Sequence, residues 1–110
     1  AMIRALTLTV ILALTACTEA TQAVDDVGRR SAKATVAKAL STRFPAVPQT
    51  AVTPFTDCVI DNASLRELRS FAGDAITGVD EATVALITTV LQRPETQQCI
   101  ATRGLAALAA

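Results

Sequence analysis

The segment that most constrains the fold is a short apolar run near the start of the chain, because it separates a removable leader from the part that folds. The run extends from Ala5 to Leu14, follows the positively charged Arg4, and ends in the string Leu14-Thr15-Ala16-Cys17. It is too short to span a bilayer, which takes about 20 apolar residues. A charged start, a short apolar run and small residues before a cysteine are typical of a bacterial lipoprotein signal peptide. We therefore predict a leader over residues 1–16 and a lipid on Cys17.

Two other interpretations of this segment stay open. A general signal peptidase could cut after Ala16 or a little later and leave Cys17 unmodified, or the leader could be retained with residues 3–16 as a membrane-bound helix. As a lipoprotein, the mature chain is anchored in the cell envelope through Cys17 and faces the periplasm. Thr18 follows the anchor in place of the aspartate associated with inner-membrane retention, so the outer membrane is the expected location.

The two remaining cysteines are predicted to form a disulfide. Residues 17–110 suffice for one small domain, which buries only about 60 to 65% of its unfolded surface and gains much from a cross-link. With Cys17 assigned to lipid, Cys58 and Cys99 form an even pair in an exported chain, where disulfides persist. In the chain-entropy model this bridge is worth about 4 kcal/mol. The alternative is a pair of buried free thiols.

The residues that follow Cys17 are predicted to form a weakly packed tether. Residues 17–43 are rich in alanine and charge, and two aspartates lie four residues ahead of two arginines, an order that favours ion pairs along one helix. These residues are Asp25, Asp26, Arg29 and Arg30. The apolar positions are small and drift around the helix, and Gly28 costs up to about 1 kcal/mol in a helix interior. We therefore expect a helical or flexible tether.

Prolines separate this tether from the expected core. Residues 44–56 contain three prolines, which push the residues before them towards extended or turn conformations. This stretch is predicted to be a linker that lets Phe44 and Phe55 reach back onto the helices. The disulfide-closed domain is expected over residues 57–104, and residues 105–110 form a short apolar tail.

The predicted domain contains three helical patterns. The first has either Asp61 or Ser64 as its N-cap and ends at Thr77-Gly78. Its apolar face, expected to point inwards, consists of Leu65, Leu68, Ala72, Ala75 and Ile76. Asp80 caps a second helix over residues 81–92, which is apolar nearly all round and is expected to be central and buried. Pro94 starts a third helix over residues 94–103, and Gly104 ends it.

No strand-like alternation or hairpin signal is present, so the predicted class is all-α. We expect a small helical domain stapled by one disulfide and preceded by a tether. The disulfide should join the start of the residue 57–104 domain to its last helix.

The composition excludes many kinds of chemistry. The chain has no histidine, which removes the common nucleophilic triads, imidazole-ligated zinc and haem, and the usual proton shuttle. The four glycines are isolated, and a bridged Cys58 and Cys99 leave no thiolate cluster. Asp57 and Asp61 are four residues apart and could form a weak calcium site, although a helix cap and a solvated charge explain them as well. We expect no catalytic, cofactor-binding or metal-binding residue, and a non-enzymatic protein.

The charge balance argues against nucleic acid as a partner. Ten basic and ten acidic residues give a formal net charge of zero, so no overall field attracts polyanions. The expected partner is the membrane, through the lipid on Cys17, together with a possible membrane protein complex.

Several strings of the sequence resemble a known family. These are Arg43-Phe44-Pro45-Ala46-Val47-Pro48, Thr56-Asp57-Cys58-Val59-Ile60-Asp61-Asn62-Ala63, Ile76-Thr77-Gly78-Val79, and Arg93-Pro94-Glu95-Thr96 with Cys99. They look like a group of small lipoproteins of Gram-negative bacteria, many of which carry the label succinate dehydrogenase. The chain lacks the dinucleotide fold, cluster cysteines or membrane helices of such an enzyme's subunits, so the resemblance implies an accessory role. The alternative is a helical protein that binds a lipid or another small apolar ligand.

Overall fold

The structure is a computed structural model, and it describes residues 25–104 and 106. Every regular element in this part of the chain is helical, which confirms the predicted class. A first helix is described over residues 25–43. After it come η1 (Gln49–Ala51), α2 (Val52–Asp61), α3 (Leu65–Thr77), α4 (Glu81–Leu91), α5 (Pro94–Cys99) and the π-helical turn η2 (Ile100–Gly104). The predicted leader, Cys17 and nearly all of the predicted tail lie outside the described residues.

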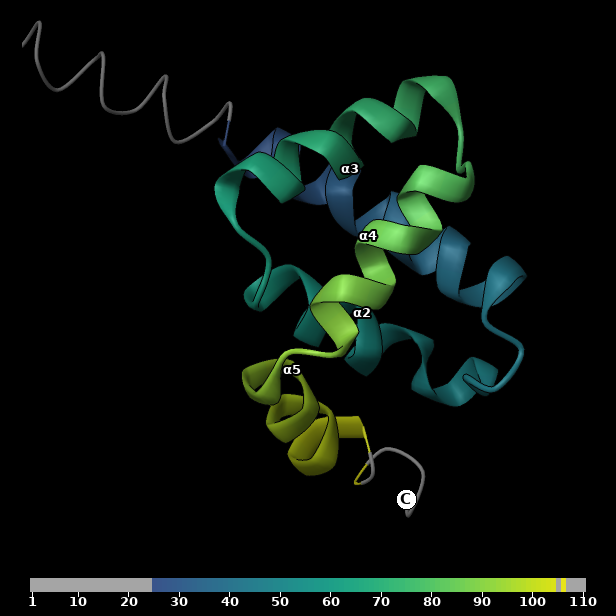
Figure 1. Cartoon of the computed structure of the whole chain (residues 1–110), viewed down its shortest axis with the longest axis vertical. Coiled ribbons are helices and arrows are strands. Elements are labelled where there is room, and N and C mark those ends of the chain that lie inside the picture. Colours follow the sequence, from purple (N-terminus) through teal and green to yellow (C-terminus); the bar gives the residue numbers. More distant parts are fainter. Residues whose placement is uncertain (1–24, 105, 107–110) are drawn as a thin grey trace, which may run out of the picture.

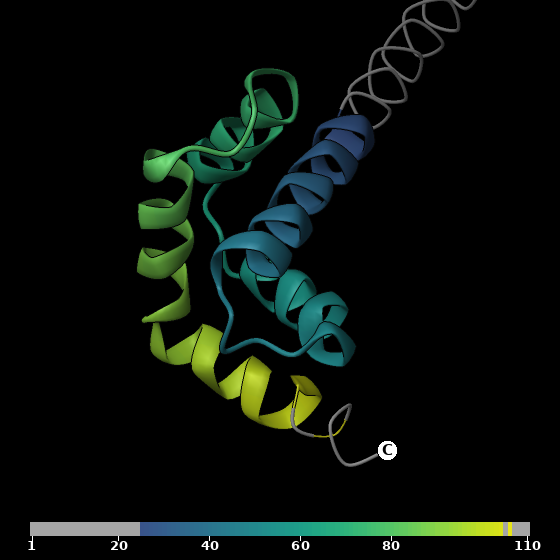
Figure 2. The ribbon, with the colours of Figure 1, turned by 90° about the vertical axis from the view of Figure 1, so that its right-hand side faces the viewer.

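The helices surround one small core. Figures 1 and 2 show the residue 25–43 helix beside α3 at one end of the domain, with α4 on the opposite side and α5 beneath α2 at the other end. The residue 25–43 helix, α2, α3 and α4 contribute buried side chains to the central cluster, whereas α5 packs against α2 through its own contacts. The cluster consists of Ala32, Val36, Ala39, Leu40, Val52, Val59, Ile60, Phe71, Ile87 and Val90.

The helix over residues 25–43 differs from the weakly packed tether that we expected. It continues without a break through Gly28, and Ala32, Val36, Ala39 and Leu40 are fully buried. Small side chains let this helix approach its neighbours closely, so the composition that suggested weak packing allows dense packing instead. The helix is therefore part of the domain.

Charged side chains further tie this helix to the others. Arg29 lies 2.6 Å from Asp61 and Lys33 lies 3.2 Å from Asp57, both on α2. The expected ion pairs between residues 25 and 29 and between 26 and 30 are absent from the described part of the chain. Arg29 instead pairs with an aspartate 32 residues away in sequence. A tertiary contact thus replaces the local one.

The predicted linker is shorter in the structure. It ends at Pro48, because η1 and α2 occupy residues 49–61. Pro54 is the third residue of α2, and a proline in the first turn is tolerated since the amide hydrogens there have no partner within the helix. Asp61 is the last residue of α2, so the open choice of N-cap for the next helix falls on Ser64.

Helices α3 and α4 begin with capping boxes. The Ser64 hydroxyl accepts a hydrogen bond from the Glu67 amide, and the Glu67 carboxylate accepts one from the Ser64 amide. Asp80 and Thr83 make the equivalent pair at the start of α4, which confirms Asp80 as its cap. These bonds satisfy amide hydrogens that a helix leaves free at its start.

Two predicted buried faces are only partly correct, although Leu68 of α3 does pack against the core. On α3 the buried residues are Glu67 and Phe71, whereas Leu65 is 60% exposed and Ile76 is 90% exposed. The one large aromatic ring of α3 decides which side of the helix turns inwards, because it buries more apolar area than the smaller residues. Helix α4 is not buried all round either, since Ala82 and Ala85 are exposed.

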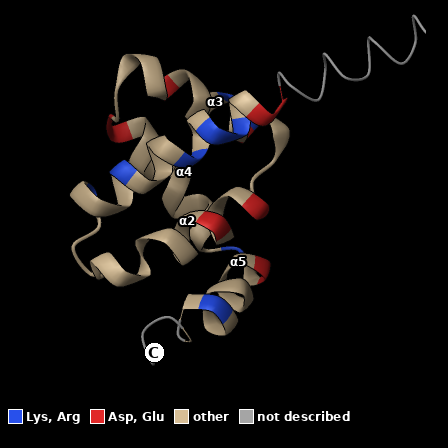
Figure 3. Ribbon diagram, turned by 180° about the vertical axis from the view of Figure 1, so that it is seen from behind, with Lys and Arg blue, Asp and Glu red and all other residues tan. Residues whose placement is uncertain are grey.

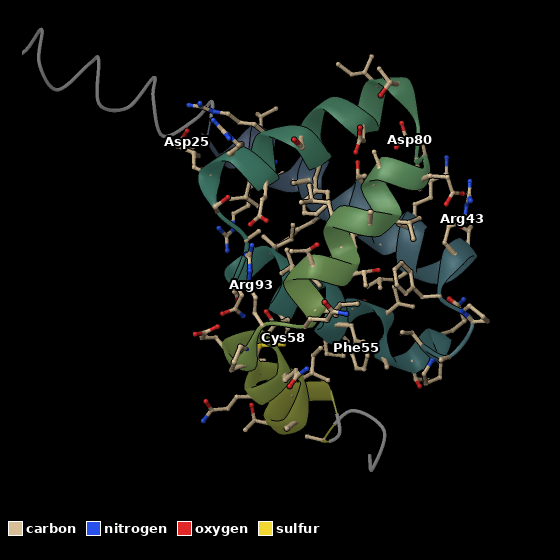
Figure 4. The ribbon with its side chains drawn as sticks, in the orientation of Figure 1. Asp25, Arg43, Phe55, Cys58, Asp80 and Arg93 are labelled. Carbon is tan, nitrogen blue, oxygen red and sulfur yellow. A yellow bond between two sulfur atoms is a disulfide. The ribbon has the colours of Figure 1, made fainter. Side chains whose placement is uncertain are left out.

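The end of the domain is held by the predicted disulfide. Cys58 on α2 is bonded to Cys99 at the end of α5, with their Cα atoms 5.6 Å apart. Beyond Cys99 the chain turns back onto α2, and Gly104 is buried against Phe55. A Cβ atom at Gly104 would lie 2.6 Å from Cε1 of Phe55, so any other residue there would force the Phe55 ring to shift. Figure 4 shows Phe55 and Cys58 at this junction.

Candidate binding groove

The structure does not bring the predicted functional residues together in one site. Cys58, which is fully buried, and Cys99, which is partly buried, form the predicted bridge between α2 and α5. Cys17 lies outside the described residues, so its lipidation stays a prediction. Asp57 and Asp61, which could have formed a calcium site, are paired with Lys33 and with Arg29 and Arg103, respectively. These pairs give both carboxylates a structural explanation.

A bidentate ion pair joins α3 to the connection that leads into α5. Two nitrogens of Arg93 each donate to one oxygen of Glu67, both at 2.7 Å, and Nη1 also donates to the carbonyl oxygen of Asn62 at 2.9 Å. The hydrogen bond from Arg93 and those from Ser64 lower the pKa of Glu67 to about 2, although burial opposes the shift. The same pair raises the pKa of Arg93. The α2–α3 and α4–α5 connections therefore meet at this ion pair.

A second polar cluster joins α3 to α4. The Thr83 hydroxyl lies 2.8 Å from the Asp74 carboxylate and 3.0 Å from that of Asp80. Hydrogen bonds from Thr83 lower the pKa of Asp80 below its usual value. Like Glu67, Asp80 is therefore held in its ionised form. An ionised carboxylate accepts hydrogen bonds but has no proton to give, so neither group is suited to act as a general acid.

A hollow lies elsewhere, between the first turns of the residue 25–43 helix and α3. It is a groove of about 400 Å³. Its lining residues are Asp25, Asp26, Gly28 and Arg29 from the first helix and Leu65, Leu68, Arg69 and Ala72 from α3. We call it the α3 groove. Figure 4 labels Asp25 where the first described turn lies beside α3.

The α3 groove is apolar inside and charged at its edge. Leu65, Leu68 and Ala72 belong to the face of α3 that we expected to be buried in the core, and the neighbouring Val27 is 63% exposed. Figure 3 shows acidic and basic positions close together on the first turns of the residue 25–43 helix. Sequence analysis missed this site because its two sides are about forty residues apart in sequence. The leucines on α3 were its only signal.

Comparisons with models of protein families, with curated proteins and with solved structures find no match for this chain. The resemblance to small lipoproteins labelled succinate dehydrogenase therefore stays a prediction. No described helix combines the length and apolar character that crossing a membrane would take.

Proposed function

We propose that the protein is a membrane-anchored lipoprotein of the bacterial periplasm that acts by binding and not by catalysis. The single observation that carries the binding role is the α3 groove, in which apolar side chains of α3 lie beside the charged first turns of the residue 25–43 helix. Exposed apolar grooves edged by polar groups are typical of binding sites. The anchor rests on the string that ends at Cys17 and on the disulfide, which suits an oxidising compartment.

The position of the groove supports the combination of anchor and binding site. Asp25, at the edge of the groove, is eight residues after Cys17. Eight residues reach at most about 28 Å, even when fully extended. A lipid on Cys17 would therefore keep the groove within that distance of the membrane surface, where a membrane-associated ligand or partner is concentrated.

Two forms of this function differ in what is bound. The resemblance stated above implies an accessory role at an envelope or respiratory membrane complex. The apolar lining of the α3 groove favours the alternative, a lipid or another small apolar ligand. The two forms share the same anchor and the same binding surface.

The anchor is tested by replacing its cysteine. Membrane and periplasmic fractions are compared for the wild type and for Cys17→Ala, with Ala16 and the rest of the leader unchanged. We expect Cys17→Ala to leave the membrane fraction or to accumulate as an uncleaved precursor. A variant that is processed normally and stays in the membrane would contradict the anchor.

The partner is tested by purification of the tagged protein from native membranes in a mild detergent. Recovery of a respiratory complex in a fixed ratio, lost in a Leu65→Gln variant, would support the accessory role. Ile76→Gln is the matched control, because Ile76 is an exposed apolar residue of the same helix that does not line the groove. Recovery that is equal in both variants would contradict binding through the groove.

A further inference from the structure

The edge of the α3 groove offers charges of both signs to a ligand. Asp25 and Asp26 lie on one helix and Arg69 on the other, and none of the three has an ion-pair partner among the described residues. Arg29 is also at the edge, but its Nη2 atom is already 2.6 Å from Asp61. The available anion site is therefore Arg69, assisted by the remaining nitrogens of Arg29, and the available cation site is the aspartate pair.

The interior of the groove fits an aliphatic chain. Leu65, Leu68 and Ala72 succeed one another along α3, and Gly28 on the facing helix has no side chain to fill the space. A Cβ atom at Gly28 would meet no atom within 4 Å, so this side of the groove is open. A volume of about 400 Å³ is at the smaller end of the range for small-molecule sites, roughly 300–1,000 Å³.

These features select among ligands by charge. A purely anionic headgroup would meet Arg69 but would also face the carboxylates of Asp25 and Asp26, which disfavour it. A cationic ligand would face Arg69 and Arg29 in the same way. A ligand with a phosphate and an ammonium group next to an acyl chain satisfies both signs and the apolar interior together.

We propose that the α3 groove binds a zwitterionic phospholipid, with its phosphate at Arg69 and Arg29, its ammonium group at Asp25 and Asp26, and an acyl chain along Leu65, Leu68 and Ala72. The proposal rests on the proposed binding function and names its ligand. The membrane to which Cys17 would attach the chain is the source of such a lipid.

The test uses the full chain in a mild nonionic detergent and two probes that differ only in the headgroup. These are palmitoyl lysophosphatidylethanolamine, which is zwitterionic, and palmitoyl lysophosphatidylglycerol, which is anionic. Dissociation constants are measured by native mass spectrometry. We expect one molecule of the ethanolamine probe per chain, bound about tenfold more tightly than the glycerol probe, since its ammonium group can pair with Asp25 and Asp26 and the uncharged glycerol cannot.

Matched variants locate the site. Arg69→Glu should weaken binding of the ethanolamine probe about tenfold. Arg66→Glu, at another exposed position of α3 that does not line the groove, should leave that affinity unchanged. The double variant Asp25→Asn/Asp26→Asn should abolish the preference between the two headgroups. Leu65→Gln should weaken both probes, and Ile76→Gln should weaken neither. Circular dichroism checks that each variant remains helical.

The outcomes separate this ligand from the rest of the function. Equal affinity for the two probes, or equal effects of Arg66→Glu and Arg69→Glu, would overturn the proposal and leave only non-specific contact with detergent-like molecules. Absence of any one-to-one complex would also overturn the proposal, and a protein partner would then be the expected occupant of the groove. None of these results changes whether Cys17 carries acyl chains, so the ligand and the anchor fail separately.

Discussion

Replacing Glu67 by glutamine should destabilise the fold in a manner that depends on pH. Glutamine keeps an acceptor for the Ser64 amide, so the capping box can persist, but it leaves Arg93 without its anionic partner. Lowering the pKa of Glu67 from 4.5 to about 2 corresponds to about 3 kcal/mol of stabilisation when the carboxylate is ionised. The Arg93 side chain is 34% exposed and solvent screens the pair, so we expect a loss of about 2 kcal/mol.

The sign of the pH dependence follows from the direction of this shift. Because the pKa of Glu67 is lower in the folded chain, its contribution is complete above pH 4.5 and disappears as the pH falls towards 2. The wild type should therefore exceed Glu67→Gln by about 2 kcal/mol at pH 7, and the two should converge near pH 2.

Urea unfolding of both proteins from pH 7 to pH 2, with the disulfide intact, measures this difference. Glu81→Gln is the matched control, because Glu81 also pairs with an arginine but its side chain is 90% exposed. We expect the control to change the free energy of unfolding by no more than about 0.5 kcal/mol. A Glu67→Gln variant as stable as the wild type at pH 7, or a difference that does not vary with pH, would refute the reasoning.

Two further substitutions test the packing. Gly104→Ala should lower the free energy of unfolding by about 1–3 kcal/mol, because the new Cβ atom would overlap the Phe55 ring. Gly73→Ala is the control: its position is helical, exposed and surrounded by open space, so this change should raise the free energy of unfolding by up to about 1 kcal/mol. Equal effects in thermal unfolding would contradict the close contact. Thr96→Val should stabilise the fold by about 1 kcal/mol, because the buried Thr96 hydroxyl has no hydrogen-bond partner in the described chain. Thr89→Val should give no gain in stability, because the exposed Thr89 hydroxyl donates a hydrogen bond to the Ala85 carbonyl. A destabilised Thr96→Val variant would show that its hydroxyl is satisfied.

The features that the sequence predicted correctly are local. The cap at Asp80, and Ser64 as one of two alternative caps, depend on a side chain and an amide three residues later. The start of α5 depends on Pro94 at its first position. The disulfide is a long-range contact, but it could be predicted since Cys58 and Cys99 were the only cysteines left once Cys17 was assigned to lipid in a chain predicted to be exported. Each of these inferences needed only residue types and spacing.

The features that were predicted wrongly or missed depend on tertiary packing. Which face of α3 is buried is decided by Phe71 and by the contact of Glu67 with Arg93, 26 residues further along the chain. Arg29 could pair with Asp25 or with Asp61, and only the packing of two helices selects Asp61. The α3 groove exists because Leu65 of α3 is exposed beside the first turns of the residue 25–43 helix, while Leu68 is only partly buried against the core. No pattern within one helix contains that information.

The intact mass of the protein purified from its native membranes tests the central claim most directly. The account predicts a chain that begins at Cys17, carries acyl chains on that residue, and gains the mass of two hydrogen atoms when the Cys58–Cys99 bridge is reduced. A mature chain that begins at or after Cys17 without any acyl mass would contradict the lipoprotein and with it the membrane-anchored binding function.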